Sequence, residues 1–113
     1  MARDKKAILE QLATKAIRLG AEEIEVEHKD RCEEVFAIKS EFGVGIASLR
    51  RSSPQAVALS KELYALTKKK RRMTLDNLTY EMRARIFDSF GEDAFRVELR
   101  HVKARQRRSS GLP

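Results

Sequence analysis

The sequence predicts a two-layer α+β domain in which two helices cover one face of a five-stranded antiparallel sheet, in the order αβββαββ. Two segments place apolar residues every three or four positions, which is the spacing of one helix face. The other apolar segments alternate with polar residues, as strands with one buried face do. Apolar residues make up 42% of the 113 residues, enough for the core of one domain. We therefore expect a single domain over residues 1–104.

The first predicted helix spans residues 4–19. Its apolar stripe consists of Ile8, Leu9, Leu12, Ala16 and Leu19. Asp4 belongs to the residue types that cap helix starts, and Gly20 is the type that most often follows a helix end. The segment is therefore expected to pack its stripe against the sheet.

The first predicted strand, residues 23–28, alternates Ile24 and Val26 with acidic residues. The acidic face consists of Glu23, Glu25 and Glu27. Such a face is either solvated, which also protects a sheet edge, or a weak site for a divalent cation.

Two further strands, within residues 34–50, form a predicted hairpin. Pairing Ser40 with Val44 leaves a three-residue loop that contains a glycine. The same register places Ile38 opposite Ile46 on one face of the sheet.

The second predicted helix lies in residues 52–70. Ser53 is a natural N-cap, and Pro54 is favoured at the first helical position. The buried stripe is predicted to consist of Ala56, Leu59, Leu63 and Leu66. This helix therefore has the same amphipathic design as the first.

A last hairpin is predicted in residues 78–102, with Asp88 paired with Asp93 across the loop Ser-Phe-Gly-Glu. On the apolar face, this register pairs Ile86 with Phe95, Ala84 with Val97, Met82 with Leu99 and Tyr80 with His101. On the polar face, it pairs Arg83 with Glu98 and Glu81 with Arg100. On this polar face, only Arg85 opposite Arg96 joins like charges. One register therefore satisfies both faces.

Ten positive charges gather in two segments, residues 68–72 and residues 100–108. They are Lys68, Lys69, Lys70, Arg71, Arg72, Arg100, Lys103, Arg105, Arg107 and Arg108. The net charge of the chain is +7, and the other fourteen lysines and arginines are outnumbered by seventeen acids. The first segment precedes one strand of the last hairpin and the second segment ends the other strand. We therefore expect the two segments to lie side by side.

A basic end of this kind suits RNA, DNA or a ribonucleoprotein. It predicts a small, non-enzymatic module that binds nucleic acid. The competing interpretation is structural, because lysines at a helix C-terminus complement the helix dipole and keep a protein soluble. Residues 105–113 are polar and basic and are predicted to form a disordered tail.

The sequence predicts no catalytic, cofactor-binding or metal-binding residue. It contains no phosphate-binding glycine loop. Its two histidines, His28 and His101, are expected to be structural residues at strand edges. Its single cysteine, Cys32, excludes an internal disulfide and fits a reducing compartment.

A cytoplasmic location is expected, because residues 1–12 lack the apolar segment of a secretory signal and no apolar run approaches the length of a membrane span. The alternative to nucleic acid is a protein partner. Phe90 at the hairpin tip is predicted either to contact such a partner or to fold onto the sheet. A free sheet edge would also allow homo-oligomers.

Residues 16–27, "AIRLGAEEIEVE", resemble the "A-x-x-x-G-A-S-D-I-H-I-E" opening of the N-terminal module of type II secretion and type IV pilus ATPases. Residues 89–100, "SFGEDAFRVELR", are similar to the hairpin that ends that module. Glu22, Glu23 and Glu25 depart from the family motif, and the nucleotide-binding Walker segments are absent. The resemblance therefore implies a stand-alone protein-docking module and carries no ATPase activity.

Overall fold

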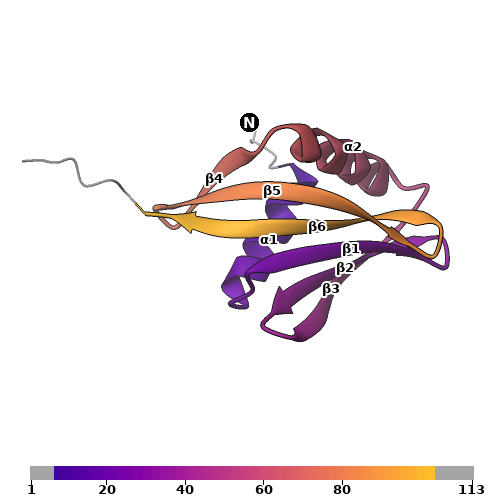
Figure 1. Cartoon of the computed structure of the whole chain (residues 1–113), viewed down its shortest axis with the longest axis horizontal. Coiled ribbons are helices and arrows are strands. Elements are labelled where there is room, and N and C mark those ends of the chain that lie inside the picture. The colour runs from indigo at the N-terminus through magenta and orange to yellow at the C-terminus, as the bar shows by residue number, and fades with distance from the viewer. Residues whose placement is uncertain (1–6, 104–113) are drawn as a thin grey trace, which may run out of the picture.

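A six-stranded antiparallel sheet, with strands in the order β3-β2-β1-β6-β5-β4, carries both helices on one face (Figure 1). The computed structural model describes residues 7–103. The helices are α1 (Ile8–Arg18) and α2 (Pro54–Lys68). The strands are β1 (Glu23–Lys29), β2 (Cys32–Lys39), β3 (Phe42–Arg50), β4 (Arg71–Leu75), β5 (Leu78–Ser89) and β6 (Glu92–Val102). The general class is α+β, as predicted.

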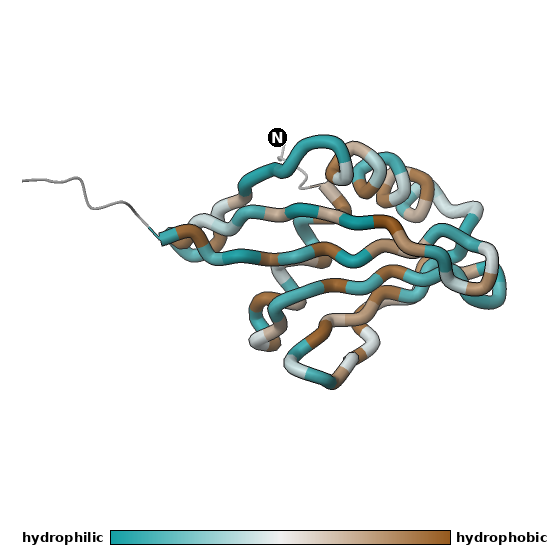
Figure 2. Tube along the Cα trace, viewed as in Figure 1, coloured by the Kyte–Doolittle hydropathy of each residue, from teal (hydrophilic) through white to brown (hydrophobic). Residues whose placement is uncertain are grey.

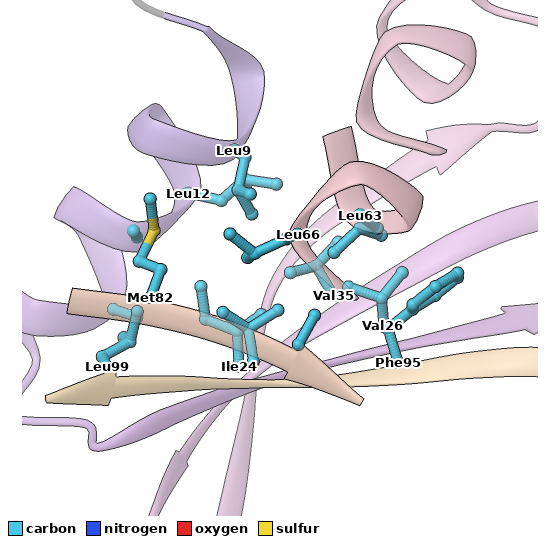
Figure 3. Packing of buried hydrophobic residues seen from close by; sticks show 14 of the residues in the cluster. Leu9, Leu12, Ile24, Val26, Val35, Leu63, Leu66, Met82, Phe95 and Leu99 are labelled. Atoms are coloured by element: carbon cyan, nitrogen blue, oxygen red, sulfur yellow. The ribbon is translucent and has the colours of Figure 1, made fainter. Parts of the chain in front are cut away.

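The hydrophobic core lies between the two helices and the sheet face that they cover (Figure 3). Leu9 and Leu12 of α1 and Leu63 and Leu66 of α2 point towards the sheet. The buried sheet residues in this view include Ile24, Val26, Val35, Met82, Phe95 and Leu99. Figure 2 shows the alternation of hydrophobic and hydrophilic residues along the strands that produces this face. Burial of these alternating apolar residues against the helices holds the two layers together.

The predicted count of five strands is wrong, because residues 71–75 form a sixth strand, β4. Met73 and Leu75 alternate with polar residues and are buried. Asp76 and Asn77 form the two-residue turn into β5, with φ values of 52° and 66°. Aspartate and asparagine tolerate this left-handed conformation better than most residues. The element order is therefore αβββαβββ rather than αβββαββ.

The β5–β6 hairpin has the predicted register throughout. Met82 pairs with Leu99, and both side chains are buried. The pairing continues one step beyond the prediction, since Ser89 pairs with Glu92. The turn is therefore the two residues 90–91, both with positive φ, as a tight hairpin turn requires.

The predicted register of the β2–β3 hairpin is wrong. Ile38 pairs with Gly43 and not with Ile46. The turn has only two residues, because Lys39 already pairs with Phe42. Further along, the pairing is interrupted by a bulge whose extra residue is Ile46. A glycine-rich strand offers few side chains that fix its register, so the alternation pattern is a weak guide here.

The helix boundaries agree with the predicted capping residues where they are described. The Ser53 hydroxyl accepts a hydrogen bond from the backbone N–H three residues on, and Pro54 is the first residue of α2. Gly20 follows α1 with a φ of 84°. The predicted start of the first helix at Asp4 and the predicted tail of residues 105–113 lie outside the described residues.

We expect Leu59→Ala to lower the free energy of unfolding by about 2–5 kcal/mol, because the Leu59 side chain of α2 is fully buried in the core. Val57 on the same helix is 48% exposed, so Val57→Ala should change stability by no more than about 0.5 kcal/mol. Urea unfolding of the two variants measures the difference. Equal effects would show that α2 does not pack on the sheet through this face.

Candidate functional site

The first basic segment, residues 68–72, is divided between two faces of the molecule. Lys68 ends α2, and the next two residues connect the helix to β4. Successive side chains of a strand point to opposite faces. Arg71 lies on the helix side, where its guanidinium is 4.0 Å from the carboxylate of Glu10. Arg72 lies on the opposite face, which carries no helix in the described residues 7–103 and which we call the uncovered face.

Glu81 of β5 lies at the centre of a basic cluster on this uncovered face. It pairs in register with Arg72 of β4 and with Arg100 of β6. Its carboxylate is 2.9 Å from Nη2 of Arg100, 3.4 Å from Nζ of Lys70 and 3.9 Å from Nε of Arg72. Glu81 is only 7% exposed, because these long side chains surround it. We call Lys70, Arg72, Glu81 and Arg100 the basic cluster.

The basic cluster keeps a net positive charge, with three cations around one carboxylate. The hydrogen bond from Arg100, together with the charge of Lys70, holds the pKa of Glu81 below its ordinary value of 4.5. The cations themselves stay accessible, since 51% of the Lys70 side chain and 64% of the Arg72 and Arg100 side chains are exposed. Their remaining N–H groups can therefore donate to a second anion.

The two predicted basic segments meet at the basic cluster. Arg72 and Arg100 both line an open hollow of about 990 Å³ at one end of the sheet. Lys103 and His101, from the second segment, line the same hollow. The remaining cations of that segment lie outside the described residues: Arg105, Arg107 and Arg108.

A second ionic group, around Arg96 of β6, lies on the same face of the sheet. Its Nη1 is 3.0 Å from Oε1 of Glu23, and its Nη2 donates to Glu25. Both glutamates belong to β1, the neighbour of β6 on the side away from β5. The like-charge pairing of Arg85 with Arg96 is thus relieved, because Arg96 is bound to the acids of β1.

The acidic face of β1 is occupied by these contacts and is not arranged as a cation site. A hydrogen bond with Glu27, together with the neighbouring Arg96, lowers the pKa of Glu25. The same hydrogen bond raises the pKa of Glu27. Among residues 7–103, no group of His, Cys, Asp and Glu side chains is positioned to hold a metal ion.

His28 forms a network that the sequence did not predict. Its Nδ1 is 3.1 Å from Oε2 of Glu33, and its Nε2 is 2.9 Å from Nη1 of Arg51. An arginine can only donate, so Nε2 accepts and Nδ1 carries the proton that is donated to Glu33. Arg51 also reaches Glu92, at 3.5 Å. The nitrogen that would act as a base is therefore covered, which suits a structural role.

This network lines a cavity of about 360 Å³, together with residues of α2 and β6. Tyr64 of α2 donates a hydrogen bond to Asp93 at 2.5 Å. The Tyr64 ring also packs edge-on against Phe95, with 5.0 Å between the ring centroids. The polar groups named here are bonded to one another, so these contacts attach the helix to the hairpin.

Phe90 is fully exposed at the tip of the β5–β6 hairpin. Of the two alternatives left open for this residue, packing onto the sheet is therefore excluded. A protein contact through Phe90 stays a prediction.

Neither the protein-family models nor the curated proteins include a match to this sequence. Neither helix in residues 7–103 has the length and apolar character needed to cross a membrane.

We expect the stability conferred by Glu81 to depend on pH. The folded-state pKa of Glu81 lies below its ordinary value, so its ion pairs stabilise the fold fully above about pH 4.5 and are lost as the pH falls through the folded-state pKa. Glu81→Gln should therefore lower the melting temperature at neutral pH, and this difference should shrink in acid. Glu41→Gln, in the exposed β2–β3 turn, is the control and should have little effect at either pH. A pH-independent difference would contradict this account.

Proposed function

We propose that the protein is a non-enzymatic module that binds nucleic acid, either free or within a ribonucleoprotein, through its basic end. The observation that carries the proposal is the meeting of Arg72 and Arg100 around Glu81 on an uncovered sheet face. Lys70 and Lys103 extend the positive surface on either side. We regard these four cations as the described part of the interface.

The basic cluster is suited to phosphate because its guanidinium groups are held in position while most of their N–H donors remain available. An arginine has five N–H donors in a planar fork that matches phosphate oxygens. Arg100 donates one of these hydrogen bonds to Glu81 and is otherwise largely exposed. The carboxylate therefore fixes the position of the fork while most donors remain available.

A polyanion suits this surface better than a small anion does. Three of the four cations, Arg72, Arg100 and Lys103, line an open hollow and not a closed pocket. A polymer can engage several of them at once and gains from the release of its counterions. Contacts of this kind go to the phosphate backbone, so binding should depend little on base sequence.

A second candidate function is protein docking, as the resemblance to the secretion-ATPase module suggests. It is favoured by the complete exposure of Phe90, an aromatic side chain of the type that anchors interfaces. Phe90→Ser would weaken capture of a protein partner and leave nucleic-acid binding unchanged. The two candidates therefore predict opposite outcomes for the same variant.

We expect the binding constant for nucleic acid to fall with salt, with a log–log slope of about −3 to −5 if roughly half of the ten charges engage. Replacing Arg72 and Arg100 together with alanine should make the slope shallower by about two units. Fluorescence anisotropy of a labelled oligonucleotide between about 50 and 200 mM salt measures the slope. Arg50→Ala is the matched control, because Arg50 is exposed on β3 at the far side of the sheet.

Truncation after Val102 removes the rest of the second basic segment and should also make the slope shallower, by up to about three units. The proposal fails if nucleic acid is not bound even at about 50 mM salt. It fails equally if the Arg72 and Arg100 double variant binds as the wild type does.

Glu81→Gln should act in the opposite direction. It removes the one negative charge of the basic cluster, so the folded variant should bind nucleic acid more tightly than the wild type at low salt. The measurement is the same anisotropy titration, made at a temperature at which circular dichroism shows the variant to be folded. Weaker binding by the folded variant would mean that the cluster needs its carboxylate to present the cations.

A further inference from the structure

Beyond the basic cluster, β5 carries more cations along the same uncovered face. Because Met82 and Ala84 are buried against the helices, the alternate residues of β5 point the other way. These are Glu81, Arg83, Arg85 and Phe87. Arg83 and Arg85 are exposed, and neither forms an ion pair within residues 7–103, although Arg83 lies opposite Glu98 of β6. The positive surface therefore continues along β5 away from the basic end.

On the side away from β6, the second half of β5 is not paired with another strand of residues 7–103. Figure 1 shows that β4 is short and runs beside only the first part of β5. Its pairing with β5 stops at Met82. From Arg83 to Ser89, β5 has no strand on that side in the described chain. A ligand lying along this stretch meets no obstruction from a neighbouring strand.

An aromatic ring ends this row of arginines. Phe87 is 36% exposed and lines a hollow of about 310 Å³ together with Arg85, Ile86 and Arg96. The guanidinium of Arg96 is bound to the acids of β1, so Arg85 is the cation of this hollow that remains free for a ligand. A free guanidinium beside a partly exposed ring is suited to one phosphate and one base.

The acidic residues of the same face limit where a polyanion can lie. The glutamates of β1, including Glu23 and Glu25, are on the far side of β6 from β5. They repel phosphate from that half of the sheet. The favourable path therefore follows β5, from the basic cluster to Phe87.

We propose that the nucleic acid bound by this protein is single-stranded and lies along β5, with its phosphates near Arg83 and Arg85 and one base stacked on Phe87. This inference rests on the proposed function and specifies its substrate. A duplex keeps its bases stacked inside and can offer none to Phe87, whereas a single strand can turn a base outwards. The bound nucleic-acid strand therefore runs along the axis of β5.

The test compares a labelled oligothymidylate with a duplex of the same length. The wild type should bind the single strand more tightly. Phe87→Leu keeps an apolar side chain but removes the aromatic face, and should weaken single-strand binding by roughly 5- to 100-fold with no change for the duplex. Phe90→Leu is the matched control, because Phe90 is exposed at the hairpin tip beyond this path. Arg85→Ala should make the single-strand slope shallower by about 0.7 units.

A fluorescent base analogue within the oligonucleotide gives a second readout. The wild type should quench its emission, and Phe87→Leu should not. A purely structural role for Phe87 would not produce this difference in quenching. Equal affinity for single strand and duplex, with no effect of Phe87→Leu, would overturn this inference. The basic end would then be a site that binds single-stranded and duplex nucleic acid alike. Binding of neither nucleic acid would overturn the proposed function itself.

Discussion

The pairing of β5 with β6 in a single register determines what each face of the sheet can do. It turns Met82 and Leu99 towards the helices and Glu81 and Arg100 towards the uncovered face. A shift by one residue would exchange these two sets and bury the charges. The core and the basic cluster therefore depend on the same register and would be lost together.

Glu81 connects the stability of the fold with the proposed binding of phosphate. Without a carboxylate at this position, Lys70, Arg72 and Arg100 would repel one another. With it, the cations are drawn together but part of their charge is neutralised. A bound phosphate would share the same donors with Glu81. Greater stability of the free protein is thus opposed to tighter binding, a balance that functional sites often show.

How much could be predicted from the sequence depended on how many independent patterns agreed. In the last hairpin, apolar alternation and cross-strand charges such as Arg83 with Glu98 required the same register, and the prediction was correct. β4 was missed because only Met73 and Leu75 mark its buried face within a charged run. The β2–β3 register was missed because a strand with Gly43 and Gly45 specifies its partner weakly.

The candidate site was predictable only in outline, because its contacts depend on strand order. Adjacency of the two basic segments follows from the hairpin, but the separation of Arg71 from Arg72 follows from the unpredicted strand β4. The role of Arg96 required the position of β1 beside β6, which joins segments far apart in the sequence. Since Arg96 is held by β1, Arg85 is left without an ion pair among residues 7–103. On this sheet face, the acids that bind Arg96 thus lie on the β1 side of β6, and the exposed arginines lie on the β5 side, where we propose that the polyanion binds.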